Sequence, residues 1–198
     1  MKIKTENTEL IYTALFAGLW GVVEVTIGTI LHASRIPFRG SLLTIVAIIL
    51  ITTSRFFINY KGSILALCSV AATIKLITLP GFNITPFIAI MMEGIIGEIV
   101  FSIMKYNLLS SVLAGSLIMI YTLLHSLFMQ GVFFGLGIYN VYIDLMNSIG
   151  RGLNYEGEIS YIMIPLIIIA YIIVGGAAGL FGWKTANRTY EILTAESE

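Results

Sequence analysis

The sequence contains few charged residues and almost no cysteine. Lys, Arg, Asp and Glu make up 11% of its 198 residues, whereas a soluble domain has about 25%. The formal net charge is zero, which excludes the basic surface typical of a nucleic-acid-binding protein. A single cysteine, Cys68, excludes an internal disulfide. No polar stretch is long enough to form a soluble domain, so any ATP-driven work must be done by other chains.

Apolar residues take the place of the missing charges. They make up 58% of the chain, and its mean hydropathy is +0.95. They are grouped into six runs, at about 10–31, 41–58, 62–79, 84–104, 108–134 and 160–183. A helix rises about 1.5 Å per residue, so runs of this length suit a hydrocarbon layer of about 30 Å. We predict an all-α integral membrane protein, a single domain over residues 1–198 that forms a six-transmembrane-helix bundle.

The links between these runs contain the residues that break helices. Pro37 lies in the first link, and Pro80-Gly81 ends the third run. The long link 135–158 is different, because apolar residues recur in it at helical spacing, at Tyr139, Tyr142, Ile143, Met146 and Ile149. This pattern predicts a short amphipathic helix over about 139–149 that lies either on the membrane surface or over the mouth of a cavity.

The Lys and Arg residues in the links predict the orientation of the chain. A cytoplasmic N-terminus puts seven of them inside and three outside, which favours cytoplasmic N- and C-termini. The inner set is Lys2, Lys4, Arg55, Lys61, Lys105, Lys184 and Arg188, and the outer set is Arg35, Arg39 and Arg151. The first run is too long for the core of a signal peptide and lacks a clear cleavage site, so we expect it to be retained.

Four ionisable side chains lie inside different runs at a similar depth. Glu24, Lys75, Glu93 and His125 are expected about 7–14 Å below the outer surface. A charge inside lipid costs at least about 2.5–3.5 kcal/mol, so such residues are candidates for function. Two carboxylates and one lysine sum to −1. We therefore predict a water-accessible pocket for a small polar ligand with a cationic or hydrogen-bond-donating group. The alternative is an ion pair of Lys75 with Glu24 or Glu93 that holds helices together.

Aromatic and amide side chains complete the predicted pocket. Trp20 lies one turn from Glu24, Tyr121 lies one turn from His125, and Gln130 lies nearer the outer end of its run. The predicted substrate-binding residues are Trp20, Glu24, Lys75, Glu93, Tyr121, His125 and Gln130. Glu98 lies deeper and about 140° around the helix from Glu93, and its role stays open.

Small residues lie at helical spacing in the inner half of the first run. Ala14 and Gly18 form one such pair and Ala17 and Gly21 form another, and either pair allows a second helix to approach closely. The combination of six runs, a polar outer layer and these pairs resembles the substrate-binding subunits (S components) of energy-coupling-factor vitamin transporters. In that family an alanine-x-x-x-alanine motif on the first span contacts the coupling subunit. Here glycine takes the second place, which keeps the residue small.

The resemblance implies a function and a set of partners. The chain would be a membrane-embedded, high-affinity binding subunit for a small water-soluble micronutrient, such as a vitamin, a precursor or a heterocycle. It would work with a transmembrane coupling subunit and two cytoplasmic ATPases in the plasma membrane of a prokaryote. The coupling subunit would bind at Ala14, Ala17, Gly18 and Gly21. The resemblance implies no catalytic residue, metal or cofactor in this subunit.

Two other functions stay open. The first is a non-catalytic membrane assembly or scaffold subunit, in which the buried charges hold helices together. The second is an intramembrane metal-dependent enzyme that uses Glu93, Glu98 and His125. The zinc-protease sequence H-E-x-x-H is absent, and Glu93 and Glu98 are expected to point apart, so the second function is the weaker alternative.

Overall fold

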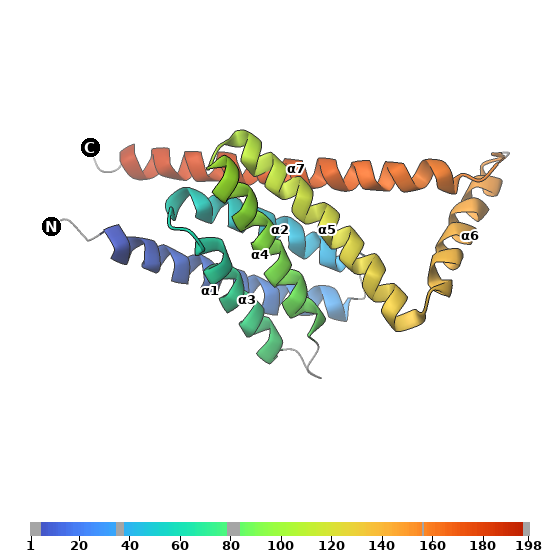
Figure 1. Cartoon of the computed structure of the whole chain (residues 1–198), viewed down its shortest axis with the longest axis horizontal. Helices are drawn as coiled ribbons and strands as arrows, with labels where there is room; N and C mark the ends of the chain where they lie inside the picture. The colour runs from blue at the N-terminus through green and yellow to red at the C-terminus, as the bar shows by residue number, and fades with distance from the viewer. Residues whose placement is uncertain (1–4, 35–37, 79–83, 156, 196–198) are drawn as a thin grey trace.

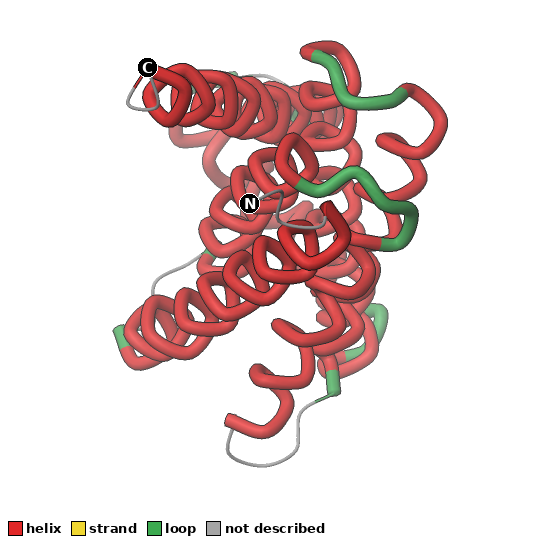
Figure 2. Tube along the Cα trace, turned by 90° about the vertical axis from the view of Figure 1, so that its left-hand side faces the viewer, coloured by secondary structure: helices red, strands yellow, loops and turns green. Residues whose placement is uncertain are grey.

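The structure, a computed structural model, describes residues 5–34, 38–78, 84–155 and 157–195 (Figure 1). It leaves out the side chains of Thr5, Glu6, Asn7 and His32. The described residues form helices joined by short links and contain no strand (Figure 2). The helices are α1 (Thr5–Ala33), α2 (Arg39–Phe57), α3 (Ser63–Thr78), α4 (Thr85–Met104), α5 (Leu108–Phe134), α6 (Gly137–Gly152) and α7 (Ser160–Ala195).

Five of these helices are long and apolar enough to cross a membrane, namely α1, α2, α4, α5 and α7. Each one coincides with a run predicted as a span. The run at 62–79 forms α3, which is apolar but has only 16 residues. The all-helical, multi-pass character of the chain therefore agrees with the prediction, whereas five of the described helices are long enough to span, so the count of six spans and the orientation of the termini stay predictions. The predictions made on Lys2, Lys4, Arg35, Pro37, Pro80 and Gly81 lie outside the described residues.

Glycine allows α5 and α7 to pack with their backbones in contact. A Cβ atom on Gly175 would collide with the carbonyl oxygen of Gly115, and one on Gly179 would collide with the carbonyl oxygen of Ser111. The small-residue run 175–179 therefore packs closely within the bundle. A similar contact joins α4 to α3, where Gly94 leaves room for Cys68. Close packing of this kind replaces the hydrophobic effect, which does not drive helix association within lipid.

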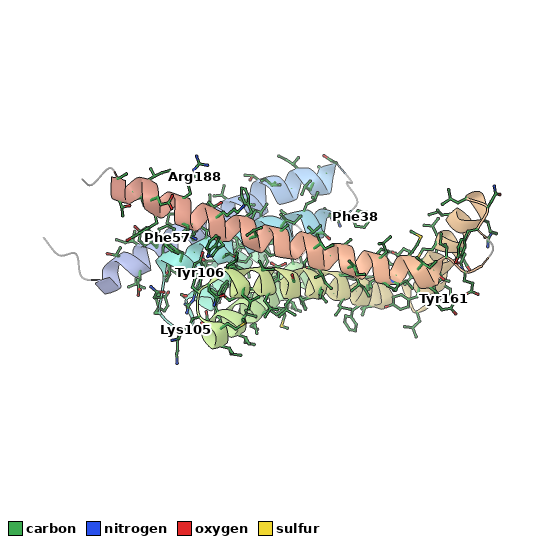
Figure 3. All side chains as sticks on the ribbon, turned by 90° about the horizontal axis from the view of Figure 1, so that it is seen from above. Phe38, Phe57, Lys105, Tyr106, Tyr161 and Arg188 are labelled. Atoms are coloured by element: carbon green, nitrogen blue, oxygen red, sulfur yellow. The ribbon has the colours of Figure 1, made fainter. Side chains whose placement is uncertain are left out.

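Both termini lie at the same end of the molecule (Figure 1). Aromatic rings from several helices gather at this end, where Phe56 packs edge-on against Tyr106 and Tyr190 with ring centroids 5.4 and 5.6 Å apart. Figure 3 shows Phe57 and Tyr106 in this region and Tyr161 at the far end of the molecule. Tyrosine is enriched where membrane helices meet water, and this cluster has that composition.

The predicted amphipathic helix is present as α6, at the end opposite the termini (Figure 1). Tyr139 donates a hydrogen bond to the carbonyl of Leu127 on α5 (3.1 Å), and Asn147 accepts one from the backbone N–H of Ser160 at the start of α7 (3.2 Å). Within the described part of the chain α6 contacts α5 and α7 and no other helix. It therefore does not cover the side chains of α1, α3 and α4 in this structure.

Candidate functional site

Glu24 and Lys75 form an ion pair inside the bundle. The Nζ atom of Lys75 on α3 lies 3.2 Å from Oε2 of Glu24 on α1, and it donates a hydrogen bond to the backbone carbonyl of Glu24 (2.7 Å). Both residues are buried, at 7% and 5% exposure. Gly28 makes room for the pair, because a Cβ atom there would lie 2.5 Å from Nζ. Of the two partners that the sequence allows for Lys75, the structure selects Glu24.

Trp20, one turn earlier on α1, donates a hydrogen bond to the same carboxylate. It is fully buried, and its indole N–H points to Oε1 of Glu24 at 3.4 Å, one helical turn away. The two oxygens of Glu24 are therefore divided between the indole and the ammonium group. A carboxylate held by an opposite charge and a hydrogen bond is the form in which a charge is tolerated in the membrane interior.

Glu93 has different partners. Its Oε1 atom accepts a hydrogen bond from the hydroxyl of Thr44 on α2 (2.7 Å) and lies 3.5 Å from the hydroxyl of Thr122 on α5. The two hydroxyl oxygens are 3.1 Å apart, and the Thr122 hydroxyl also reaches the carbonyl of Ile118 (3.1 Å). Three helices therefore meet at one carboxylate oxygen. Among the described residues no lysine, arginine or histidine forms an ion pair with Glu93.

The two carboxylates belong to one cluster. Glu93 lies on α4, which packs against α3, the helix that carries Lys75, through the contact of Gly94 with Cys68. We call Glu24, Lys75, Glu93, Thr44 and Thr122 the polar cluster. Its members come from α1, α3, α4, α2 and α5 and carry a formal charge of −1. The structure buries Glu24, Lys75 and Glu93 and pairs the first two, while their common depth and their role in binding a ligand stay predictions.

Tyr121 and His125 lie next to the polar cluster on α5. The Tyr121 hydroxyl and Nδ1 of His125 are 3.1 Å apart, and the ring centroids are 5.4 Å apart. Tyr121 precedes Thr122 of the polar cluster. The second ring nitrogen of His125, Nε2, is buried and has no hydrogen-bond partner among the described residues. A buried polar atom without a partner is uncommon and is a candidate for contact with a ligand or water.

Two parts of the predicted site lie elsewhere. Gln130 hydrogen-bonds to Ser126 on its own helix (3.3 Å), and no hydrogen bond links it to the polar cluster in the described structure. On α1, Ala17 and Gly21 are buried, and a Cβ atom on Gly21 would lie 2.6 Å from Ile74 of α3. This pair packs inside the bundle, so it is not available to another subunit.

The other small pair on α1 faces outward. Ala14 is exposed, and no atom lies within 4 Å of the position that a Cβ atom on Gly18 would take. The two candidate pairs are offset by three residues, which rotates them by about 60° around the helix. That rotation separates an inner packing contact from an open surface.

Glu98 lies further along α4 than Glu93 and binds the backbone at the start of α3. Its carboxylate accepts hydrogen bonds from the backbone N–H groups of Gly62 (2.8 Å) and Ile64 (3.1 Å), at the start of α3. A carboxylate stabilises the N-terminus of a helix because the free N–H groups and the helix dipole are positive there. Gly62 has a φ of +84°, a conformation that favours glycine. Glu93, Glu98 and His125 therefore have separate partners, and the structure does not bring them together as a metal-ligand set.

Sequence reasoning did not identify Thr44 and Thr122 as members of the cluster. Threonine is common in apolar helices because its hydroxyl can bond to the carbonyl one turn earlier, as Thr122 does with Ile118. Depth gave no signal for Thr44, since it lies near the start of its run, at about 4.5 Å, whereas the ionisable residues are expected about 7–14 Å deep. A surface groove of about 270 Å³ also lies along α3, but its lining of Ser69, Val70, Thr73 and Ile74 is largely apolar and includes no member of the cluster.

Comparison of the chain with models of protein families, with curated proteins and with solved structures finds no match. The function must therefore be argued from the polar cluster and from the apolar helices that enclose it.

Proposed function

We propose that this chain is the substrate-binding subunit of an energy-coupling-factor transporter and captures a small water-soluble micronutrient within the membrane. In this proposal six helices, α1–α5 and α7, cross the plasma membrane of a prokaryote, and both termini are cytoplasmic. The ligand enters from the outside and binds at the polar cluster. A coupling subunit and two cytoplasmic ATPases drive its release into the cell.

The polar cluster is the observation that supports this proposal. Four helices contribute buried polar side chains to the interior of an otherwise apolar bundle, and α5 adds the half-buried hydroxyl of Thr122. Packing alone does not require this arrangement, because each buried charge costs free energy that an apolar residue would not cost. Binding sites in membrane proteins are built from such groups, placed where helices meet.

A screen for ligands tests the proposal directly. The purified full-length protein in detergent would be heated with vitamins, their precursors and nucleobases, one at a time. A binding subunit is expected to gain several degrees in melting temperature with at least one compound, because a ligand that binds only the folded state stabilises it by mass action. If every compound leaves the melting temperature unchanged, the proposal is wrong.

The exposed pair on α1 supports a second expectation. Ala14 and Gly18 form an open, small-residue surface on the side of α1 that does not face α3. Ala14→Trp is expected to abolish uptake by the assembled transporter while ligand affinity stays unchanged. Ala17→Trp is the matched control, because Ala17 is buried, so it should lower the stability of the subunit itself. Loss of ligand affinity in Ala14→Trp would contradict the proposed docking surface.

A membrane assembly subunit is the second candidate, and the Glu24–Lys75 pair favours it. Two of the three N–H donors of Lys75 contact the carboxylate and the carbonyl of one residue, Glu24, which is what an ion pair that joins α1 to α3 requires. Such a subunit would be destabilised by loss of the pair and would show no thermal stabilisation by any compound in the screen.

A further inference from the structure

We infer that the ligand of the polar cluster is an organic cation and that its positively charged nitrogen binds the carboxylate of Glu93. This inference rests on the proposed function and specifies the class of ligand. It assigns different roles to the two acidic residues of the cluster, which are equivalent in the sequence-based prediction: Glu24 is structural and Glu93 recognises the ligand.

Lys75 is not available to bind an anionic ligand. Its Nζ atom contacts both the side-chain and the backbone oxygens of Glu24, at 3.2 and 2.7 Å. The only space for it beside α1 exists because residue 28 is glycine. An incoming carboxylate or phosphate would have to displace Glu24 and would leave that residue buried without a cation. A buried charge that loses its partner costs about 3–5 kcal/mol, so a ligand that competes for Lys75 is disfavoured.

Glu93, by contrast, is held by groups that can change their role. The Thr122 hydroxyl can donate its hydrogen to the carbonyl of Ile118 or toward the Thr44 and Glu93 oxygens, because all three acceptors lie within 3.5 Å. Both threonines approach the same carboxylate oxygen, Oε1. The other oxygen, Oε2, receives neither of these bonds, and it is the atom that we assign to the cation.

The charges within the polar cluster also favour a cationic ligand. Glu24 and Lys75 neutralise each other, and Glu93 is the acidic residue of the cluster that has no cationic partner among the described residues. It is 5% exposed and accepts hydrogen bonds from hydroxyl groups alone in the described structure. A ligand with one positive charge makes the cluster neutral, whereas a neutral ligand leaves a buried carboxylate unpaired and an anionic ligand adds to the repulsion.

The aromatic rings beside Glu93 suit a cation attached to a flat or compact organic group. Tyr121 precedes Thr122 on α5, and its ring is tilted against that of His125, with the centroids 5.4 Å apart. Aromatic faces attract organic cations by about 0.5–2 kcal/mol. The buried Nε2 atom of His125 offers one further polar contact. Nitrogen heterocycles with a quaternary or protonated nitrogen, and quaternary amines, combine these properties.

The test compares cations with neutral molecules of the same shape. The melting temperature of the full-length protein in detergent would be measured with choline and its neutral analogue 3,3-dimethyl-1-butanol, with 1-methylnicotinamide and nicotinamide, and with the screening compounds sorted by charge at neutral pH. We expect the compounds that stabilise the protein to be cations. Glu93→Gln is expected to weaken their binding roughly 100-fold, since it removes one partner of a buried charge pair.

Glu98→Gln is the matched control, because it changes a carboxylate that is equally buried, on the same helix, at the other end of the bundle. It should leave ligand affinity unchanged. Glu93→Gln should also raise the melting temperature of the ligand-free protein, because it removes an unpaired buried charge. If Glu93→Gln does not fold, Thr122→Val, which keeps the side-chain shape, is expected to weaken cation binding about tenfold.

The outcomes separate this inference from the proposed function. If the stabilising compounds are neutral or anionic, or if a cation binds Glu93→Gln as tightly as the unchanged protein, the function stands and the cation assignment is wrong. If no compound of any charge stabilises the protein, both are wrong.

Discussion

Helix α4 carries two buried carboxylates, five residues apart, in contrasting surroundings. Glu93 and Glu98 are 5% and 8% exposed. Glu98 accepts hydrogen bonds from two backbone N–H groups of the α2–α3 turn and from the hydroxyl of Ser102. Glu93 accepts hydrogen bonds only from the hydroxyls of two threonines in the described structure. Burial alone therefore does not distinguish a structural carboxylate from a candidate recognition group.

The difference lies in what holds each charge. A backbone N–H at the start of a helix always donates and cannot turn away, so Glu98 is fixed for as long as α3 is folded. A hydroxyl can rotate, and it can act as donor or acceptor. Glu93 can therefore exchange a partner for a ligand without unfolding a helix, and Glu98 cannot. Arg55 stabilises the link between α2 and α3, where Glu98 binds, because it donates hydrogen bonds to the carbonyls of Tyr60 and Ile58 in that link (2.9 and 3.4 Å).

The largest effect is expected from breaking the ion pair next to Glu93. Glu24→Gln leaves Lys75 buried without an opposite charge, and it should lower the free energy of unfolding by about 3–5 kcal/mol. Reversible unfolding in mixed detergent and SDS micelles would measure the loss. This substitution tests the distinction between the two acidic residues of the cluster, because Glu93→Gln is expected to have the opposite sign.

The double variant Glu24→Gln with Lys75→Met provides the control. It removes both charges and keeps the volume, so most of the lost stability should return. If the double variant is as unstable as Glu24→Gln alone, Lys75 is not the partner whose charge the carboxylate neutralises.

A loss of stability of intermediate size is expected when the carboxylate of Glu98 is removed. Glu98→Ala removes the acceptor for the N–H groups of Gly62 and Ile64, and it should cost about 2–3 kcal/mol, because buried donors are left without partners. Hydrogen exchange of the first turn of α3 would speed up most, while exchange near Glu93 should not change. Equal acceleration of hydrogen exchange in the first turn of α3 and near Glu93 would mean that Glu93 and Glu98 belong to one cooperative unit. It would contradict the proposed difference between the two carboxylates.

The sequence predicted the helices well, because apolar runs of about 18 to 27 residues have few alternative structures in a membrane. It also indicated that Glu24 and Lys75 can meet, since depth follows from counting residues at about 1.5 Å each. Depth does not determine which way a side chain points around the bundle. The sequence alone could not decide between Glu24 and Glu93 as the partner of Lys75.

Rotation around the helix axis also explains the remaining differences. Ala17 and Ala14 both belong to small-residue pairs, but only the contact of α1 with α3 shows that Ala17 is inside and Ala14 is outside. Glu98 had no predicted role because its partners are backbone N–H groups, which every residue except proline carries and which leave no sequence signal. Thr44 was missed because a hydroxyl in an apolar helix usually bonds within its own helix.

The smallest effects compare single hydroxyls on the two carboxylates of α4. Thr44→Val removes the closest partner of Glu93 (2.7 Å) and is expected to cost about 2 kcal/mol, the range for a hydrogen bond to a charged group. Ser102→Ala removes a partner of Glu98 at 3.1 Å and should cost about 0.5 kcal/mol, because two backbone N–H groups still hold that carboxylate. Unfolding in mixed micelles would measure both. If the two losses are equal, the hydroxyls contribute alike, and the claim that Glu93 depends on side chains that can rotate, while Glu98 depends on the backbone, is contradicted.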